Sequence, residues 1–148
     1  DASFKMLIKK VLKEHKNFFE LDGFEVIVKK SSKDEACISE ASIKLKVNGE
    51  STSAVGEGDG PVDALNMALR SALMKFFPAI KGVNLSDYRV SILDPEEATS
   101  ARTRVQIEST DGSSKWGTVG VSENIIEASW EALVDGVEYK LFLDEEAE

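Results

Sequence analysis

The chain has few of the residues that build disulfides and metal sites. Among its 148 residues there is one cysteine, Cys37, and one histidine, His15. A single cysteine excludes an intrachain disulfide and fits a reducing compartment, so we expect a cytoplasmic protein. A lone histidine has no second imidazole with which to share a metal ion. We therefore expect neither a metal site nor a bound cofactor in this chain.

Positive charge is also scarce. Lys and Arg number 18 against 27 Asp and Glu, which gives a net charge of −9. This balance argues against nucleic acid and against an anionic membrane surface. No apolar run approaches the roughly 20 residues that span a bilayer, and no signal peptide is visible. The chain begins Asp-Ala-Ser without methionine, and we expect it to be a piece of a larger protein.

The richest local signal is the stretch Gly56–Ala72, GEGDGPVDALNMALRSA. Three glycines at its start predict a tight loop or a close approach to a ligand. Pro61 suits the first position of a helix, and apolar residues then recur at helical spacing. The stretch therefore predicts a loop followed by a helix over about 61–76, whose free backbone N–H groups attract anions.

The type of anion follows from the neighbouring charges. No lysine is present for a phosphate-binding loop, and Glu57 and Asp59 would repel a phosphate. A zwitterion suits the loop better, with its carboxylate on the helix N–H groups and its ammonium near Asp59 or Asp63. Alternatively the acids only favour the helix dipole, which is common in a first helical turn. The residues alone leave both interpretations open.

The first half of the chain predicts a helix, three strands and a helix. Apolar residues at helical spacing over 4–12 predict a short amphipathic helix. Asp22-Gly23 predicts a turn and Asn48-Gly49 a hairpin. Alternating or β-branched segments predict strands at 24–30, 36–47 and 50–55.

The second half predicts the same order of elements. Strands are expected at 88–93, 103–109 and 115–121, with a hairpin at Asp111-Gly112. Asn124 followed by Glu127 has the spacing of a capping box, and helical periodicity continues to Leu141. A short terminal strand at 139–143 is the competing interpretation, and the acidic tail 144–148 is expected to be disordered.

Aligning Gly56 with Gly120 superimposes the two halves. Five further positions then match, pairing Val62, Asp63, Ala64, Ala68 and Leu69 with Ile126, Glu127, Ala128, Ala132 and Leu133. We therefore predict an α+β fold of two β-β-β-α units, 21–80 and 85–143, each a small antiparallel sheet with one helix packed on it. A linker helix segment over 1–20 precedes this domain of residues 21–148, and we expect a dimer.

Two motifs carry a resemblance to a known family. GEGDGPVDALNMAL resembles the glycine-proline signature in the C-terminal regulatory domain of the 2-isopropylmalate synthase family. WGTVGVSENIIEASWEALVDGVEYKL and HKNFFELDGFEVIV resemble the citramalate synthase branch. The resemblance covers nearly the whole chain, and its first 15 or so residues match the linker to the catalytic barrel.

The resemblance implies a function for the domain and for its parent. The intact enzymes condense acetyl-CoA with a 2-oxo acid on an N-terminal TIM barrel that holds a divalent metal. The C-terminal domain binds an end-product amino acid at a dimer interface and inhibits the barrel. The branch resemblance favours isoleucine, and leucine is the alternative because both are the same zwitterion. No catalytic residue is expected in this chain.

The family's effector contacts carry over to the loop and first helical turn of each unit. They correspond to Gly58, Gly60, Pro61, Val62 and Asp63, and to Val121, Asn124 and Ile125. The strand that enters the second unit adds Leu85, Tyr88 and Ile92. Val62, Ile92 and Ile125 could equally be core residues.

Two other functions compete with effector binding. A dimerisation module without a ligand explains the same repeats. A small enzyme would have to use Glu57, Asp59 or Asp63 as acid or base, but these carboxylates share one exposed loop and the sequence shows no buried partner for them.

Overall fold

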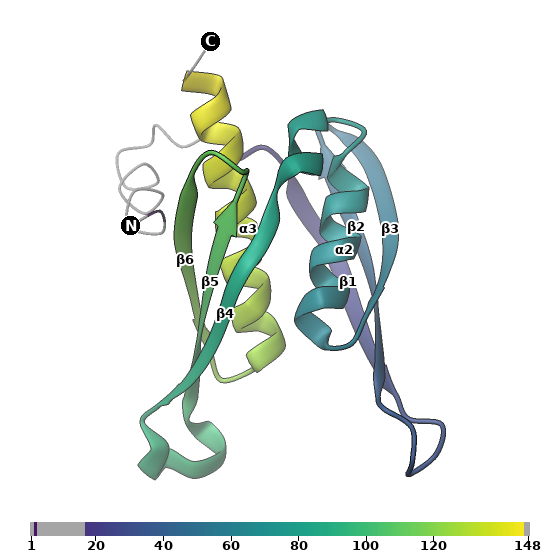
Figure 1. The fold of residues 1–148 in the computed structure, drawn as a ribbon, viewed down its shortest axis with the longest axis vertical. Helices are drawn as coiled ribbons and strands as arrows, with labels where there is room; N and C mark the ends of the chain where they lie inside the picture. Colours follow the sequence, from purple (N-terminus) through teal and green to yellow (C-terminus); the bar gives the residue numbers. More distant parts are fainter. Residues whose placement is uncertain (1, 3–16, 147–148) are drawn as a thin grey trace. The chain divides into compact units, whose positions relative to one another are not determined.

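The structure, a computed structural model, describes Ala2 and residues 17–146. The chain forms two compact units, Asn17–Lys81 and Gly82–Glu148, and Ala2 packs with the second of them. Each unit has three strands followed by one helix, so we call them the first repeat and the second repeat (Figure 1). The α+β fold predicted from the sequence is confirmed. The helix expected over 4–12 lies outside the described residues.

The first repeat is an antiparallel sheet in the order β1-β2-β3 with helix α2 on one face. Its elements are β1 (Glu20–Lys29), β2 (Ile38–Val47), β3 (Glu50–Gly58) and α2 (Pro61–Leu73), followed by the short 3-10 helix η1 (Pro78–Gly82). The predicted hairpin is confirmed, since Asn48 and Gly49 both adopt positive φ, at 52° and 79°. Those angles match the twist of two paired strands.

Three boundaries predicted for the first repeat are wrong. Asp22-Gly23 makes no turn: β1 begins at Glu20, and its register with β2 shifts between Leu21 and Gly23, which is a β-bulge. Helix α2 ends at Leu73, whose carbonyl oxygen accepts hydrogen bonds from two later backbone N–H groups. Strand β3 continues to Gly58, so Gly56 and Gly58 lie in a strand rather than in a loop.

Close packing explains the strand glycines. A Cβ atom at Gly56 would lie 2.4 Å from the carbonyl oxygen of Ala64 and from the amide nitrogen of Ala68. A Cβ atom at Gly58 would lie 2.6 Å from the Cβ of Asp63. Glycine is therefore needed here because the backbone of α2 lies directly against β3, not because of a positive φ.

The second repeat has the sheet order β4-β5-β6 with helix α3 on one face. Its elements are β4 (Asn84–Leu93), the 3-10 segment η2 (Pro95–Ser100), β5 (Arg102–Thr110), β6 (Lys115–Ser122) and α3 (Ile125–Glu146). Helix α3 replaces the alternative strand at 139–143. It also includes residues 144–146 of the tail that was expected to be disordered, and Lys140 Nζ lies 3.0 Å from Asp144 Oδ1 one turn along it.

The two repeats have the same strand register at a constant difference of 64 residues. The β1–β2 pair Leu21–Leu45 corresponds to the β4–β5 pair Leu85–Ser109, and both edge strands carry a bulge directly after that pair. The hydrogen bond between Thr52 Oγ1 and the Ala72 carbonyl corresponds to that between Trp116 Nε1 and the Gly136 carbonyl. The duplication inferred from six sequence matches therefore extends to the strand register, the bulges and a hydrogen bond between strand and helix.

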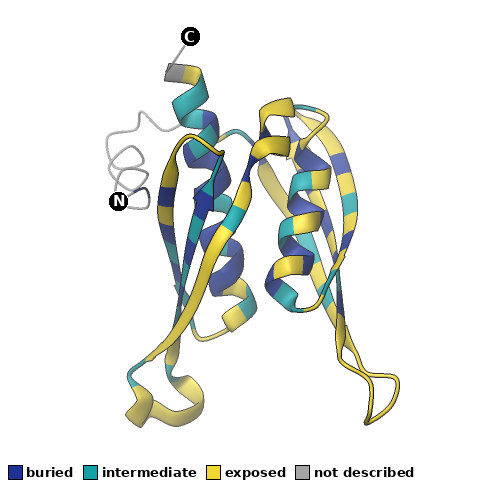
Figure 2. Ribbon diagram, in the orientation of Figure 1, coloured by how far each residue is buried: buried dark blue, intermediate teal, exposed yellow. Residues whose placement is uncertain are grey.

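Each repeat buries one face of its sheet beneath its helix. Burial alternates along β2 and β5, as expected where one face is covered (Figure 2). The first core is aliphatic and is built mainly from Ile43, Leu45, Leu65, Leu69 and Leu73. The second core includes Val105, Ile107, Thr118 and Leu133. The rings of Trp116 and Tyr139 also pack together there, with their centroids 6.0 Å apart. The helices pack mainly on the other two strands of each sheet and leave the edge strands β1 and β4 largely uncovered.

Candidate functional site

The N-terminus of α2 has no side-chain cap. Gly60 is its N-cap residue, with extended backbone and no side chain to accept a hydrogen bond, and Pro61 follows in the first turn. Asp63 is exposed in that turn, whereas Val62 is buried in the core of the first repeat. The first-turn N–H groups are therefore left for solvent or for a ligand.

The N-terminus of α3 is capped by its own side chain. Asn124 Oδ1 accepts hydrogen bonds from the backbone N–H groups of Ile126 and Glu127, at 2.8 and 3.2 Å. The predicted cap is thus present, but its reciprocal half differs: the N–H of Asn124 donates to Ser122 Oγ at 3.1 Å. Ile125 beside the cap is 42% exposed. This helix end has less free capacity for an anion than that of α2.

A carboxylate on α3 accepts a hydrogen bond from the nearby edge strand β6. The N–H of Val121 donates to Glu131 Oε2 at 3.0 Å, so a strand group that faces outward is satisfied by the helix. The equivalent positions in the first repeat are Glu57 and Met67. A thioether is only a weak acceptor, so β3 has no matching helix carboxylate at its edge.

Strand β4 presents an apolar row on the side that faces α3. Leu85, Tyr88, Val90 and Ile92 pair with the inward-facing residues of β5, which assigns them to that side of the sheet. Helix α3 packs on β5 and β6 and leaves this row uncovered, so Tyr88 is 39% and Ile92 64% exposed. The row is therefore an apolar surface without a described cover.

The predicted contact residues fall into three groups. Gly58, Gly60, Pro61, Val62 and Asp63 lie together at the start of α2. Val121, Asn124 and Ile125 lie together at the start of α3, and Leu85, Tyr88 and Ile92 are spread along β4. Ile92 shares a row of the sheet with Thr103 and Ser122, next to Asn124. Leu85 lies about 20 Å farther along the strand, so one free amino acid cannot contact both residues of the same protomer.

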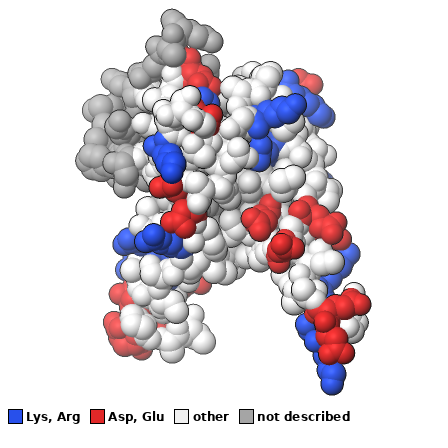
Figure 3. Space-filling view, viewed as in Figure 1, with Lys and Arg blue, Asp and Glu red and all other residues white. Residues whose placement is uncertain are grey.

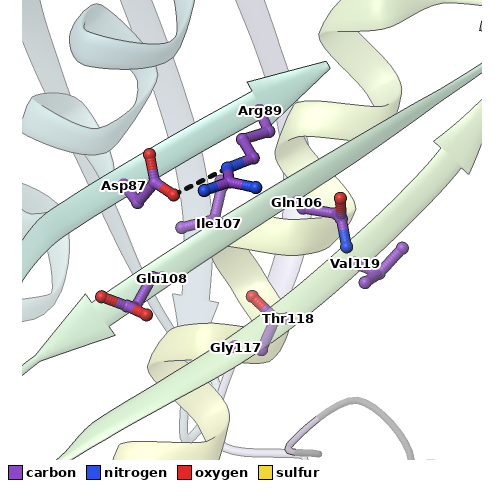
Figure 4. A pocket seen from close by; sticks show the side chains of 8 residues that line it. All are labelled: Asp87, Arg89, Gln106, Ile107, Glu108, Gly117, Thr118 and Val119. Atoms are coloured by element: carbon purple, nitrogen blue, oxygen red, sulfur yellow. Dashed lines mark hydrogen bonds and ion pairs between the residues drawn. The ribbon is translucent and has the colours of Figure 1, made fainter. Parts of the chain in front are cut away.

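The opposite, open face of the second sheet holds a shallow cavity that the sequence did not predict. Its volume is about 260 Å³, and it contains none of the predicted residues. Arg89 Nε and Asp87 Oδ2 form an ion pair of 3.0 Å at its rim (Figure 4). Both side chains are exposed, and such pairs add little stability. The cavity's open, polar form gives it no evident specificity.

Charged side chains gather away from the buried faces. Acidic residues cluster on η2, which carries Glu96 and Glu97, and at the C-terminal end of α3 (Figure 3). Near that end, Asp111 Oδ2 binds Lys140 Nζ at 2.8 Å, and Asp111 Oδ1 accepts the N–H groups of Ser113 and Ser114. The Lys140 ammonium and these N–H groups hold the pKa of Asp111 far below its usual range. No local sequence pattern predicts a pair 29 residues apart.

The described residues contain neither a cluster of metal ligands nor a membrane-spanning helix. Within residues 17–146 no three His, Cys, Asp or Glu side chains are grouped so that they could hold a metal ion. No helix in the described part of the chain is long and apolar enough to cross a membrane.

The fold and these sites define a class of protein: a duplicated α+β domain with an uncapped helix N-terminus beside acidic side chains and an uncovered apolar strand. Comparison of sequences gives the family. The chain belongs to the LeuA allosteric (dimerisation) domain family, whose profile matches residues 1–141.

Individual relatives agree with this assignment. The chain is 51% identical over its full length to a protein named (R)-citramalate synthase from Geobacter sulfurreducens and covers 28% of that protein. It is 48% identical over 99% of its length to the Aquifex aeolicus protein of the same name, and again covers 28% of it. A 2-isopropylmalate synthase from Aquifex aeolicus is 36% identical over 68% of the chain, which covers 18% of it. The chain therefore spans about a quarter of these relatives.

Proposed function

We propose that this chain is the regulatory domain of an acetyl-CoA-dependent citramalate synthase and binds isoleucine for feedback inhibition of branched-chain amino-acid biosynthesis. The family assignment and the names of the similar proteins support this proposal. Since the chain spans about 28% of those relatives, the remainder can hold an N-terminal catalytic barrel. We propose that this barrel, rather than the present domain, binds the divalent metal and acetyl-CoA.

The observation that carries the proposal is the uncapped N-terminus of α2. Gly60 leaves first-turn N–H groups without a side-chain acceptor, and these groups together with the helix dipole favour a carboxylate. Asp63 lies in the same turn and Asp59 directly before it, where either can accept the ammonium of the same ligand. An α-amino acid supplies both charges at the required short separation.

The side chain of the ligand would be held by apolar residues near the N-terminus of α3. Ile125 and Ile92 are both large, apolar and exposed, and the sheet register brings Ile92 to the same end of the second repeat. We propose that these residues contact the side chain of the bound amino acid at the dimer interface. Tyr88 and Leu85 would then contribute mainly to the dimer contact along β4 rather than to the ligand.

Isoleucine is proposed over leucine because the similar proteins that match nearly the whole chain are named citramalate synthases. The two amino acids have the same charges, so only the shape of the pocket can separate them. A misfit of one methylene is worth about 1–3 kcal/mol, which is roughly a 10- to 200-fold difference in affinity.

Calorimetry of the 148-residue chain with isoleucine, leucine and valine tests the proposal. We expect saturable heat with isoleucine and weaker binding of the other two. The absence of heat with all three at millimolar concentration would instead favour the ligand-free dimerisation module. Tightest binding of leucine would favour a leucine-sensing domain of a 2-isopropylmalate synthase. Sedimentation at several protein concentrations gives the oligomeric state independently of the ligand.

Hydrogen exchange tests the mechanism. Binding at the helix N-termini should slow exchange over residues 56–64 and 119–126, because the ligand orders both turns and shifts the dimer contact. Exchange there that is indifferent to saturating isoleucine would contradict this mechanism.

A further inference from the structure

Strand β3 forms one margin of the first sheet (Figure 1). Among the described residues it pairs only with β2, in a continuous register from Glu50 to Gly58 without a bulge. Its residues 51–56 include no charged side chain and no proline. Charges, prolines and bulges are the usual means by which an edge strand avoids pairing with another strand. Over these residues β3 has none of them.

The second repeat shows which backbone groups of β3 face outward. The N–H of Val121 points away from β5, because it donates to Glu131. Val121 corresponds to Glu57 in the matching register of the first sheet. Alternate residues of a strand direct their N–H and C=O groups to the same edge. The outward groups of β3 are therefore those of Ser51, Ser53, Val55 and Glu57, whose side chains are all exposed.

The side of α2 that lies along this edge is apolar. A Cβ atom at Gly56 would lie 2.9 Å from the Cβ of Met67, which places Met67 beside β3. Ser71 and Met74 follow on the same side at helical spacing. Met67 is 48% and Met74 37% exposed. The corresponding residues of α3 are all acidic, namely Glu131, Asp135 and Glu138.

We propose that the outer edge of β3 is a self-association surface, on which β3 of a second copy of this chain pairs antiparallel. The pairing joins two three-stranded sheets into one sheet of six strands. When the two strands overlap fully, Ala54 lies opposite Ala54 of the partner subunit. This contact needs no ligand and is distinct from the contact proposed along β4, so the two together would join dimers into larger assemblies.

The charges of the strand support this register. Glu50 lies opposite Gly58 of the partner subunit, and Glu57 opposite Ser51 of the partner subunit, so like charges do not meet. Lys46 is the β2 neighbour of Ser51 within each sheet. It is thus two strand spacings, about 10 Å, from the partner's Glu57, a span that lysine and glutamate side chains cover together. The pairing therefore brings each exposed Glu57 near a lysine of the other copy.

The same two-fold axis brings the two α2 helices together. Thr52 Oγ1 bonds to the Ala72 carbonyl, and a Cβ atom at Gly56 would touch the Ala68 amide, so Ala54 lies near residue 70 of the helix. An antiparallel helix pair centred there sets Met67 of one copy against Met74 of the partner subunit. Since α2 lies over β2 and β3, the helix axes are about 10 Å apart, the usual distance for packed helices.

Pulsed electron paramagnetic resonance of the 148-residue chain tests the pairing. A nitroxide is placed at Glu25→Cys in a Cys37→Ser background. Glu25 lies on β1 in the same row of the sheet as Ser42 and Val55. In the six-stranded sheet the two labels are five strand spacings apart, and we expect a distance peak at about 25 Å. Absence of this peak up to millimolar protein would overturn the proposal.

A matched pair of substitutions in α2 tests the helix contact. Met67→Glu copies the residue at position 131, and we expect it to weaken the pairing at least about tenfold, because a carboxylate is then buried against Met74 of the partner subunit. Met67 is half-exposed in the single chain, so the fold should remain intact. Asn66→Glu adds the same charge about 100° round the helix and should keep the peak.

Equal peaks from the two α2 variants would overturn the proposal. All samples lack an amino-acid effector, and isoleucine binding is measured separately by calorimetry. A failure of the β3 pairing therefore leaves the proposed function standing.

Discussion

The two repeats have the same strand register but differ at the ends of their helices. At the N-terminus, α2 has the bare glycine Gly60 where α3 has the capping residue Asn124. At the C-terminus, α2 stops at Leu73, whereas α3 continues for nine residues past the equivalent position. The interior of a βββα unit must keep its strand–helix contacts to remain folded, but helix ends can change at low cost. Functional differences between the repeats are therefore expected at those ends.

The third strands, β3 and β6, show the same pattern. Their packing against the helix is shared, whereas their exposed edges differ. Gly56 and Gly120 occupy equivalent positions, and each allows a helix backbone to contact the strand. At the exposed edge of β6, Glu131 accepts a hydrogen bond from the N–H of Val121. The equivalent residue in the first repeat is Met67, whose thioether sulfur is only a weak acceptor. The edge of β6 is closed by its own helix, whereas that of β3 is not.

The largest expected effect comes from filling the two equivalent glycines. A Cβ atom at Gly120 would lie 1.9 Å from the Ala128 carbonyl oxygen, and one at Gly56 would lie 2.4 Å from that of Ala64. Gly120→Ala and Gly56→Ala should each lower the free energy of unfolding by about 3 kcal/mol, because backbone must move. Urea unfolding measures this loss. Gly117→Ala, whose nearest neighbouring atom is 3.9 Å away, is the control and should change stability by less than about 0.5 kcal/mol.

The second effect concerns the helix caps and isoleucine binding. Gly60→Asn copies the residue found at position 124, and its side-chain oxygen would occupy the N–H groups proposed to bind the carboxylate. We expect the affinity for isoleucine to fall about tenfold or more, while the helix itself gains a few tenths of a kcal/mol. Calorimetry measures the affinity.

Gly60→Ala is the matched control for this substitution. Nothing lies within 4 Å of an added Cβ at this position, and alanine brings no acceptor, so the affinity should remain near that of the unsubstituted chain. If Gly60→Asn and Gly60→Ala bind isoleucine equally well, the carboxylate is not held at this helix end.

A smaller effect is expected from the equivalent bonds between strand and helix. Trp116 Nε1 donates to the Gly136 carbonyl at 2.9 Å, and Thr52 Oγ1 donates to the Ala72 carbonyl at 3.3 Å. Trp116→Phe should cost about 1–2 kcal/mol, including lost packing, and Thr52→Val about 0.5–1 kcal/mol, because the longer bond is weaker. Thermal unfolding would measure both. A larger loss from Thr52→Val would show that the two bonds are not equivalent.

The smallest effect is the pH dependence of the Asp111–Lys140 pair. The pKa of Asp111 is lowered in the folded chain, so the unfolded chain takes up the proton first as pH falls. The pair's contribution is therefore complete above about pH 5 and is lost progressively as pH falls below the ordinary aspartate pKa near 4. Lys140→Met should flatten this part of the stability–pH curve. Lys115→Met, which removes an exposed lysine 3.9 Å from Glu108, should leave it unchanged.

The sequence was most informative where a structure depends on local chemistry. Asn48-Gly49 specified its hairpin because the turn needs two positive φ angles, which asparagine and glycine adopt readily. Asn124 was correctly identified as a helix cap. The prediction was less accurate at Gly56 and Gly58, where glycine was interpreted as a loop signal. Their actual cause is the backbone of α2 packed on β3, a contact that arises only when the helix folds back onto the strand.

By itself the sequence determined the duplication, the order of strands and helices and the family, because all three depend on periodicity and on motifs within short segments. Tertiary structure alone decided the bulges at equivalent places in β1 and β4, the closure of β6 by Glu131, and the pairing of Asp111 with Lys140. These features join groups on different elements. Their energies depend on distances that arise only when sheet and helix pack together.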